Sequence, residues 1–266
     1  MTRVRGWALP LAAAALALFL ALPVLALLAR AVLGGKLDAV LSPSLLEALV
    51  LSLLTTAASL GLTVSFGLPL ALLLARRRFR GKRLLETIVD LPIVLPPSVA
   101  GLALLLLLGR RGPVGSALET LGVTVPFTTL AVVLAQVFVS APFFIRSARS
   151  GFAAIDREIE DAARVDGADE WRVFRFVSVP LAASALAAGA VMAWARALGE
   201  FGATIMFAGN IEGLTQTLPL VVYSEFQSSL DASVAAASVL VAAAFGVLVA
   251  VRLIRWGPAW EARSLP

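Results

Sequence analysis

Arg196 and Glu200 lie four residues apart in a stretch that is otherwise strongly apolar. On a helix this spacing puts the guanidinium and the carboxylate one turn apart on the same face, where they can neutralise one another. An ionisable side chain at the centre of an apolar membrane environment costs about 2.5 to 3.5 kcal/mol, so each of the two needs a partner. The pair either fixes its helix against neighbouring helices or rearranges during gating, and both interpretations stay open at this point.

A second group of charged residues lies between positions 146 and 180. Apolar and charged side chains alternate there at helical spacing, with Ile155, Ile159, Ala162 and Ala163 on one side and Arg157, Glu158, Asp161 and Arg164 on the other. This pattern predicts a short amphipathic helix. Gly167 can end it in the left-handed conformation, and Asp169 can cap a second helix that leads to Pro180. The apolar face of that second helix holds Trp171, Phe174 and Val177. We therefore expect a compact helical knob.

The composition excludes whole classes of chemistry. The 266-residue chain has no cysteine and no histidine. Disulfides, thiol chemistry, His or Cys metal ligands and imidazole acid-base catalysis are therefore not available to it. A nucleotide-binding loop of the Gly-x4-Gly-Lys-Ser/Thr form is also missing, since Gly81-Lys82 is followed by Arg83 and lacks the preceding glycine. We expect neither a catalytic site nor a metal or cofactor site in this chain.

The apolar content requires a lipid solvent. Hydrophobic residues make up 60% of the chain, charged residues 15%, and the mean hydropathy is +0.94, which is more apolar surface than a single water-soluble core can hide. Stretches without Asp, Glu, Lys or Arg run over Gly6 to Ala29, Ala48 to Ala75, Leu91 to Gly109, Thr120 to Ile145, Phe176 to Ala195 and Ala232 to Val251. Each approaches the roughly 20 residues that a membrane-spanning helix needs. The sequence predicts an all-α integral membrane protein with six transmembrane helices in one domain, residues 1–266.

The basic residues set the expected orientation, because Lys and Arg are retained on the cytoplasmic side. Seventeen of the 22 Lys and Arg residues fall at the two ends, in residues 76–83 and in residues 146–175, which alternate correctly with six spans. Both termini and the knob are therefore expected in the cytoplasm. A cleaved signal peptide is disfavoured because the first apolar run is too long. The basic run from Arg76 to Arg83 resembles a nucleic-acid patch but is better explained by topology, so no nucleic-acid partner is expected.

Prolines mark the third apolar stretch. Pro92, Pro96 and Pro97 remove backbone donors and should bend or break the helix near its cytoplasmic start. Broken backbone at membrane depth is tolerated where protein or a water-filled cavity surrounds it. The third span is thus expected to line a path through the membrane, and a kink used only for packing is the alternative.

The knob resembles the signature of the permease subunits of bacterial and archaeal ABC importers, which reads Glu-Ala-Ala, three residues, Gly, nine residues, Ile-x-Leu-Pro. The sequence has Ala162, Ala163, Gly167 and Pro180 in register, with Asp161, Val177 and Val179 at the other positions. The resemblance implies a type I ABC importer permease fold, in which the knob is a coupling helix docked on an ATP-binding subunit. The coupling residues would be Asp161, Ala162, Ala163, Gly167, Trp171 and Pro180, in a loop of about residues 146–180.

Three further segments resemble oxyanion permeases of the molybdate, tungstate and sulfate group. They are Arg196 to Ile211, Leu91 to Gly101 and Leu108 to Gly112, and together with Thr215 to Pro219 they favour the molybdate and tungstate branch. A tetrahedral dianion can use backbone donors at broken helix ends together with hydroxyl and amide groups. The candidate path residues are Pro96, Pro97, Ser98, Arg196, Glu200, Thr204 and Asn210.

The resemblance also implies the partners. They are a second copy of the chain, two cytoplasmic ATP-binding subunits that use ATP and Mg, an extracytoplasmic substrate-binding protein and the lipid bilayer of a bacterial or archaeal inner membrane. A sulfate or thiosulfate importer is the alternative substrate class. A secondary transporter or channel driven by an ion gradient, and a membrane scaffold that only recruits a cytoplasmic protein, are alternatives of other classes.

Overall fold

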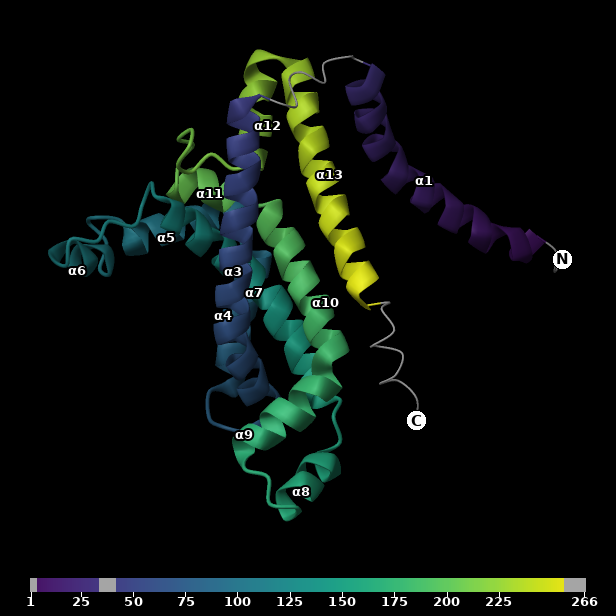
Figure 1. Ribbon diagram of the computed structural model, residues 1–266, viewed down its shortest axis with the longest axis vertical. Coiled ribbons are helices and arrows are strands. Elements are labelled where there is room, and N and C mark those ends of the chain that lie inside the picture. The colour runs from purple at the N-terminus through teal and green to yellow at the C-terminus, as the bar shows by residue number, and fades with distance from the viewer. Residues whose placement is uncertain (1–3, 34–41, 256–266) are drawn as a thin grey trace.

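The computed structural model describes residues 4–33 and 42–255, and within these ranges the regular structure is entirely helical (Figure 1). The elements are α1 Val4–Leu33, α3 Pro43–Arg76, α4 Lys82–Val94, α5 Pro97–Leu108, α6 Gly115–Thr120, α7 Thr129–Ala153, α8 Arg157–Val165, α9 Glu170–Val173, the π-helical turn η1 Phe174–Ser178, α10 Val179–Leu198, α11 Gly202–Phe207, α12 Leu218–Ser228 and α13 Leu230–Arg255. Part of the two basic ends used above for orientation, in residues 1–3 and 256–266, lies outside the described residues.

Five helical segments are long and apolar enough to cross a membrane. They are Leu9–Leu33, Pro43–Arg76, Thr129–Ala153, Glu170–Leu198 and Leu230–Val249. A sixth crossing is present if α4 and α5 are counted together, although the two helices are bent by 118°. The chain breaks between Val94 and Pro97, where two prolines follow one another, as the sequence predicts. The predicted third span is therefore broken, and α4 and α5 form either one bent crossing or a re-entrant pair.

The fourth span is shifted along the chain from its expected range, Thr120 to Ile145, to Thr129–Ala153. An expectation based on uncharged residues ended it at Ile145, whereas α7 continues to Ala153. Arg146 and Arg149 are accommodated because α4 supplies acidic partners, with Arg146 Nε 3.8 Å from Asp90 Oδ1 and Arg149 Nη1 2.8 Å from Glu86 Oε1. Paired charges thus allow a helix to extend beyond its apolar segment.

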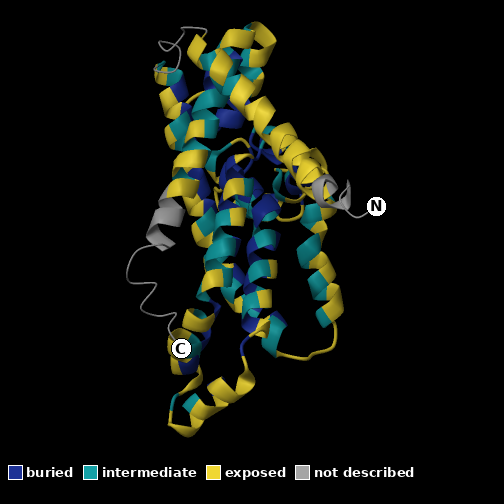
Figure 2. Ribbon diagram, turned by 90° about the vertical axis from the view of Figure 1, so that its right-hand side faces the viewer, coloured by how far each residue is buried: buried dark blue, intermediate teal, exposed yellow. Residues whose placement is uncertain are grey.

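The bundle is centred on α7, which packs against α3 on one side and α10 on the other (Figure 1). The lower part of this core is filled by Ala71, Leu74, Phe144, Ile145, Ala148, Phe152, Ile155, Ala182 and Ala193. The buried residues concentrate along these inner faces, as Figure 2 shows.

Helix α3 carries a buried stripe of small polar residues, Ser52, Thr55, Thr56, Ser59 and Thr63. Small side chains let neighbouring helices approach closely in a membrane, and hydroxyl groups can bond within the helix. The hydroxyl of Thr56 donates to the carbonyl of Ser52 at 2.7 Å, and Gln136 Nε2 of α7 donates to Thr55 Oγ1 at 3.2 Å. The hydroxyl groups of Thr55, Thr56 and Ser59 thus bond within α3, that of Thr63 has no partner, and Gln136 links the stripe to α7.

The short helices α5 and α11 pack against each other at one side of the bundle (Figure 1). A Cβ atom added at Gly101 of α5 would lie 2.5 Å from the carbonyl oxygen of Ala203 in α11. Only glycine permits this approach between the two backbones. Buried side chains of α5, α7 and α11 form the core beneath them, including Ala100, Val132, Ala203 and Phe207.

Helix α1 diverges from the rest of the bundle and packs only on α13 among the pairs with appreciable contact (Figure 1). None of its most apolar window is buried, and Figure 2 shows its ribbon exposed over the described part. Arg30 Nη2 lies 3.3 Å from Asp231 Oδ1 where the two helices meet. An apolar helix with this exposure requires lipid or another transmembrane helix around it.

Candidate functional site

The knob below the bundle is formed by α8, the turn at Gly167 and α9 (Figure 1). Asp156 caps α8, its Oδ1 accepting from the backbone N–H of Glu158 at 3.1 Å. Gly167 has φ +88°, so the chain turns there through a conformation that glycine adopts freely. Asp169 caps the next helix by accepting from the N–H of Arg172 at 2.8 Å. The predicted stop at Gly167 and the predicted cap at Asp169 are confirmed, and the cap at Asp156 is an addition that was not predicted from the sequence.

The second half of the knob differs from the expected separate helix. α9 has four residues and continues through η1 into α10 without interruption, giving one helix over Glu170–Leu198. Pro180 lies inside this continuous helix, two residues after the end of the π-helical turn, and removes one backbone donor there. Val173 is the residue of this segment that turns inward, with 2% exposed, whereas Trp171 remains 65% exposed. The expected apolar face of Trp171, Phe174 and Val177 is thus only partly buried.

The apolar residues of the knob face away from the bundle. Ile159 is 49% exposed and Val165 is 88% exposed, although Ile155 at the start of the segment is buried. Asp161 and Ala162 are exposed beside them, and the carboxylate of Asp161 pairs with Arg164 at 2.6 Å. Figure 2 shows the knob as a mostly exposed element at the lower end of the molecule. Exposed large apolar side chains on a protruding element are typical of a protein-docking site.

One knob residue was missed by sequence reasoning. Glu160 is only 5% exposed, although its neighbours Ile159 and Asp161 are exposed. Its Oε1 lies 2.8 Å from Arg76 Nη2 and accepts a hydrogen bond from Ser178 Oγ at 2.7 Å. Arg76 is 84 residues away in the chain, and no local pattern relates the two. The buried carboxylate therefore joins the knob to the ends of α3 and α10.

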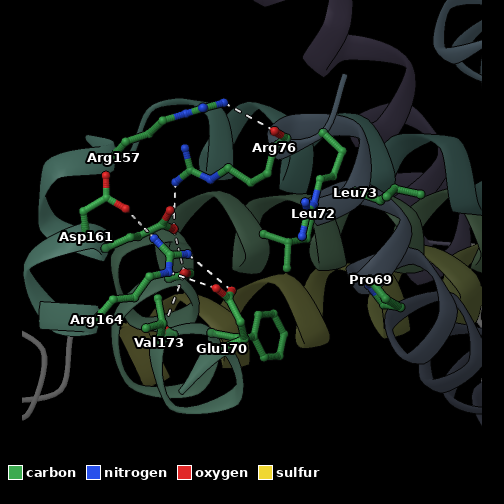
Figure 3. A pocket seen from close by; sticks show the side chains of 13 residues that line it. Pro69, Leu72, Leu73, Arg76, Arg157, Asp161, Arg164, Glu170 and Val173 are labelled. Carbon is green, nitrogen blue, oxygen red and sulfur yellow. Dashed lines mark hydrogen bonds and ion pairs between the residues drawn. The ribbon is translucent and has the colours of Figure 1, made fainter. Parts of the chain in front are cut away.

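A cavity of about 510 Å³ lies between the lower end of α3 and the knob (Figure 3). Its charged lining residues are Arg76, Arg77, Arg157, Glu160, Asp161, Arg164 and Glu170. Arg164 Nε donates to Glu170 Oε1 at 2.9 Å, and this hydrogen bond raises the pKa of the Arg164 guanidinium. Arg157 Nη2 donates to the carbonyl of Arg76 at 3.3 Å. The guanidinium groups of Arg76, Arg157 and Arg164 thus already have partners within the chain, as Figure 3 shows, and this arrangement does not favour an anion-binding site in the cavity.

The predicted Arg196–Glu200 ion pair forms where α10 ends. Arg196 Nη1 lies 2.5 Å from Glu200 Oε2, and the Glu200 side chain is 1% exposed. The other carboxylate oxygen accepts from the backbone N–H of Ala203 at 2.7 Å. A carboxylate that accepts from the first free N–H groups of a helix stabilises the start of that helix. Glu200 therefore ties the end of α10 to the start of α11.

The other candidate path residues are not all brought together. Three of them, Pro96, Pro97 and Ser98, are exposed at the start of α5. The start of α5 lies against the start of α11, as shown by the distance of only 2.8 Å that would separate a Cβ added at Gly202 from Pro97 Cβ. Thr204 is completely buried, and its hydroxyl has no hydrogen-bond partner. Asn210 lies apart from them and donates to Ser224 Oγ of α12 at 2.8 Å. Their role in a path remains a prediction.

No group of three or more acidic side chains within residues 4–33 and 42–255 is arranged to hold a metal ion.

Comparison with known proteins places this geometry in a family. The model of the family described as binding-protein-dependent transport system inner membrane component matches residues 67–256. The molybdenum transport system permease protein ModB of Mycobacterium tuberculosis is 42% identical over 233 residues, which are 88% of this chain and 88% of that one. The Escherichia coli K12 protein of the same name is 39% identical, covering 76% and 89%. The molybdate/tungstate transport system permease protein WtpB of Pyrococcus abyssi is 35% identical, covering 89% and 90%.

Solved structures share the fold. A chain of a bacterial ABC transporter involved in alginate import has a TM-score of 0.73 with 17% identity, covering 93% of each chain. A chain of the MetNI methionine ABC transporter in an inward-facing conformation has a TM-score of 0.60 with 18% identity, covering 83% of this chain and 96% of that chain. At these identities the likeness concerns the fold.

Proposed function

Because the chain belongs to the family of binding-protein-dependent transport system inner membrane components, we propose that it is the permease subunit of an ATP-driven importer of a tetrahedral oxyanion, molybdate or tungstate. The substrate class follows from relatives whose names state molybdenum or molybdate/tungstate transport and whose sequences align over most of both chains. The same class was expected from the motifs in residues 91–112 and 196–219.

The working complex contains two copies of the chain, two cytoplasmic ATP-binding subunits and an extracytoplasmic binding protein. ATP and Mg are used by the ATP-binding subunits, and both termini of the permease lie in the cytoplasm. A pathway between two equivalent subunits is the simplest arrangement for a chain of this size, because closed two-fold assemblies are the commonest kind. The most apolar window of α1 has no buried residue, which is consistent with a surface that lipid or the second copy covers.

The knob is the observation that carries the proposal. Its exposed apolar residues, Ile159, Val165 and Trp171, protrude below the bundle on an element that is capped at both helix starts. A docked ATP-binding subunit would cover them. Closure of two such subunits on ATP would draw two knobs together, and each knob continues directly into α10. The movement then reaches the start of α11, where the Arg196–Glu200 pair lies.

The test is reconstitution of the permease with its candidate ATP-binding subunit and binding protein in proteoliposomes. We expect ATP hydrolysis to rise when the binding protein is loaded with molybdate or tungstate and to stay at its basal rate with sulfate. Stimulation by sulfate alone would contradict the substrate class. Uptake that persists without the ATP-binding subunit and follows an ion gradient would contradict the importer class.

Gly167 provides a sharper test of the knob, with a matched control. Gly167→Val forces a β-branched residue into a left-handed conformation and should prevent the ATP-binding subunit from co-purifying, while membrane insertion continues. Gly81 has the same φ of +88° and the same open surroundings but lies in the turn before α4. Gly81→Val introduces the same backbone strain and should leave the complex assembled. Normal assembly of Gly167→Val would contradict the assignment of the knob.

A further inference from the structure

We infer that Glu160 is a positioning residue for energy coupling, because it clamps the coupling knob to two transmembrane helices at once. The inference rests on the proposed function and names the contact through which movement of the knob would be passed to the bundle. Glu160 lies on α8, Arg76 ends α3, and Ser178 ends η1 immediately before α10. A single carboxylate oxygen of Glu160 receives both partners, at 2.8 Å from Arg76 and 2.7 Å from Ser178.

Burial makes this contact different from the other charge pairs of the knob. The side chains of Glu160 and Arg76 are 6% and 15% exposed, whereas those of Arg164 and Glu170 are 37% and 78% exposed. Exposed ion pairs are screened and contribute little, but a buried carboxylate that loses its partner is strongly destabilised. The carboxylate of Glu160 therefore keeps its two partners in any conformation in which it stays buried.

The connectivity of α8 shows why a clamp is needed. α8 is joined to the bundle by short turns on either side, around residues 154–156 and 166–169. Two ion pairs of the described residues link α8 to the long helices: the exposed Arg164–Glu170 pair, and the buried Arg76–Glu160 pair, which is the one that reaches α3. Arg76 Nη1 also donates to the carbonyl of Ile155 at 3.3 Å, so the same guanidinium holds the start of the knob. Without the contact of Glu160 with Arg76 and Ser178, α8 could tilt about these turns without moving α3 or α10.

The second partner of Glu160, Ser178, lies in the π-helical turn η1. η1 is the segment in which the i→i+5 pattern replaces the α-helical one, with the N–H of Val179 donating to the carbonyl of Phe174. Single π-turns inside α-helices are frequent at functional sites. Ser178 is its last residue, and its hydroxyl lies 2.7 Å from the Glu160 carboxylate and 3.4 Å from the carbonyl of Val173. The buried hydroxyl of Ser178 therefore belongs both to the π-helical turn and to the contact with Glu160.

The experiment measures the number of molybdate ions transported per ATP hydrolysed by the complete complex in proteoliposomes. Glu160→Gln keeps the size and an acceptor oxygen but removes the charge that Arg76 requires, and we expect a drop of about fivefold in this ratio. Ser178→Ala removes one hydrogen bond and should give a smaller drop. The double variant Arg76→Gln, Glu160→Gln should lower the number of molybdate ions per ATP by less than the product of the two single fold-changes, because both substitutions act through one contact.

Glu86→Gln is the matched control. Glu86 also forms a 2.8 Å pair with an arginine of a neighbouring helix, Arg149, but it joins α4 to α7 and does not involve the knob. The number of molybdate ions transported per ATP by Glu86→Gln should equal that of the wild type. An equal drop in Glu86→Gln would overturn the inference, because the effect would then follow from losing any helix–helix ion pair. A lower melting temperature with an unchanged ratio in Glu160→Gln would also overturn it, since that is the result of a purely structural role.

Two further outcomes are decisive. If Glu160→Gln does not assemble, Ser178→Ala, which keeps the ion pair, decides the matter, and a wild-type ratio in that variant overturns the inference. The wild-type complex tests the proposed function separately. Absence of molybdate-stimulated ATP hydrolysis in the wild type overturns both, whereas normal stimulation with an unaffected ratio in the variants overturns the clamp alone.

Discussion

Two carboxylates in the described part of the chain are almost fully removed from solvent, and each has an arginine and a further donor as partners. Glu200 is 1% exposed and is bonded to Arg196 and to the N–H of Ala203. Glu160 is 5% exposed and is bonded to Arg76 and Ser178. An ionised carboxylate tolerates burial only when its oxygens are satisfied in this way. Each carboxylate therefore fixes a junction between helices, Glu200 at the end of α10 and Glu160 at its beginning.

Substitution of Glu200 should separate its two contributions. Glu200→Ala removes both the ion pair and the acceptor for Ala203, and should reduce the free energy of unfolding by about 3 kcal/mol. Glu200→Gln retains an oxygen that can accept from Ala203 and should be destabilised less. The melting temperatures of the purified permease variants in detergent test whether Glu200→Ala is less stable than Glu200→Gln. Substitution of the exposed Glu212 by Gln is the control. A wild-type melting temperature for Glu200→Ala would contradict this account.

Residue partners were predictable where they are local. The Arg196–Glu200 pair follows from a four-residue spacing in an apolar run, and the capping role of Asp169 follows from its place after a glycine. The burial of Glu160 did not follow, because its partner lies on a helix that ends 84 residues earlier. In the amphipathic pattern, Glu160 is one more charged residue among several. Only the packing of α8 beneath α3 decides which of those charges is buried.

At the scale of elements, the broken pair α4 and α5 sets up the candidate path region. The break at two adjacent prolines turns α5 by 118° from α4 and brings its start to the start of α11. The close approach at Gly101 then holds α5 against the backbone of Ala203. Because both helices are short, their positions depend on this contact and on Glu200 more than on their own helical propensity.

A methyl group at Gly101 should force these helices apart. Gly101→Ala places a Cβ 2.5 Å from the carbonyl oxygen of Ala203 and 2.8 Å from its Cα, and neither backbone atom can move without shifting α11. We expect a loss of about 2 kcal/mol in stability, together with reduced transport. Gly61→Ala in α3 is the control, because a Cβ there meets nothing within 4 Å. It should be neutral or slightly stabilising. Equal melting temperatures for the two variants would contradict the close-packing argument.

The helices themselves were largely predictable and their arrangement was not. Uncharged stretches located the transmembrane segments, and the prolines located the break in the third one. The bend of 118° and the pairing of α5 with α11 depend on a glycine facing a backbone oxygen, which no periodicity reveals. The extension of α7 to Ala153 likewise depends on Asp90 and Glu86 of another helix.

At the scale of the molecule, charge is distributed unequally along the bundle. The turn between α3 and α4 carries Arg77, Arg78 and Arg80, and the knob beside it carries further arginines. The loop before α7, at the opposite end of that helix, contains no Lys or Arg between residues 112 and 128. Basic segments are retained in the cytoplasm during insertion. The knob end of the molecule is therefore expected inside the cell.

The absence of native cysteine allows a clean test of this orientation. Val123, in the loop before α7, and Phe79, in the basic turn, are 43% and 39% exposed. In right-side-out vesicles, a membrane-impermeant maleimide should label Val123→Cys directly and Phe79→Cys only after permeabilisation. The cysteine-free parent chain controls for background labelling. Immediate labelling of Phe79→Cys would reverse the proposed topology.

The unbroken helix from Glu170 to Leu198 has a mechanical consequence. Its 29 residues form a rod about 43 Å long at about 1.5 Å per residue. One residue inserted into such a rod would advance its far end by about 1.5 Å and rotate it by about 100°. An insertion between Ser178 and Arg196 would turn the Arg196–Glu200 pair as a unit out of its present register with Glu160 at the other end, even though the composition of the rod had barely changed. We therefore expect the rod to tolerate a change in its number of residues less well than the loops on either side of it.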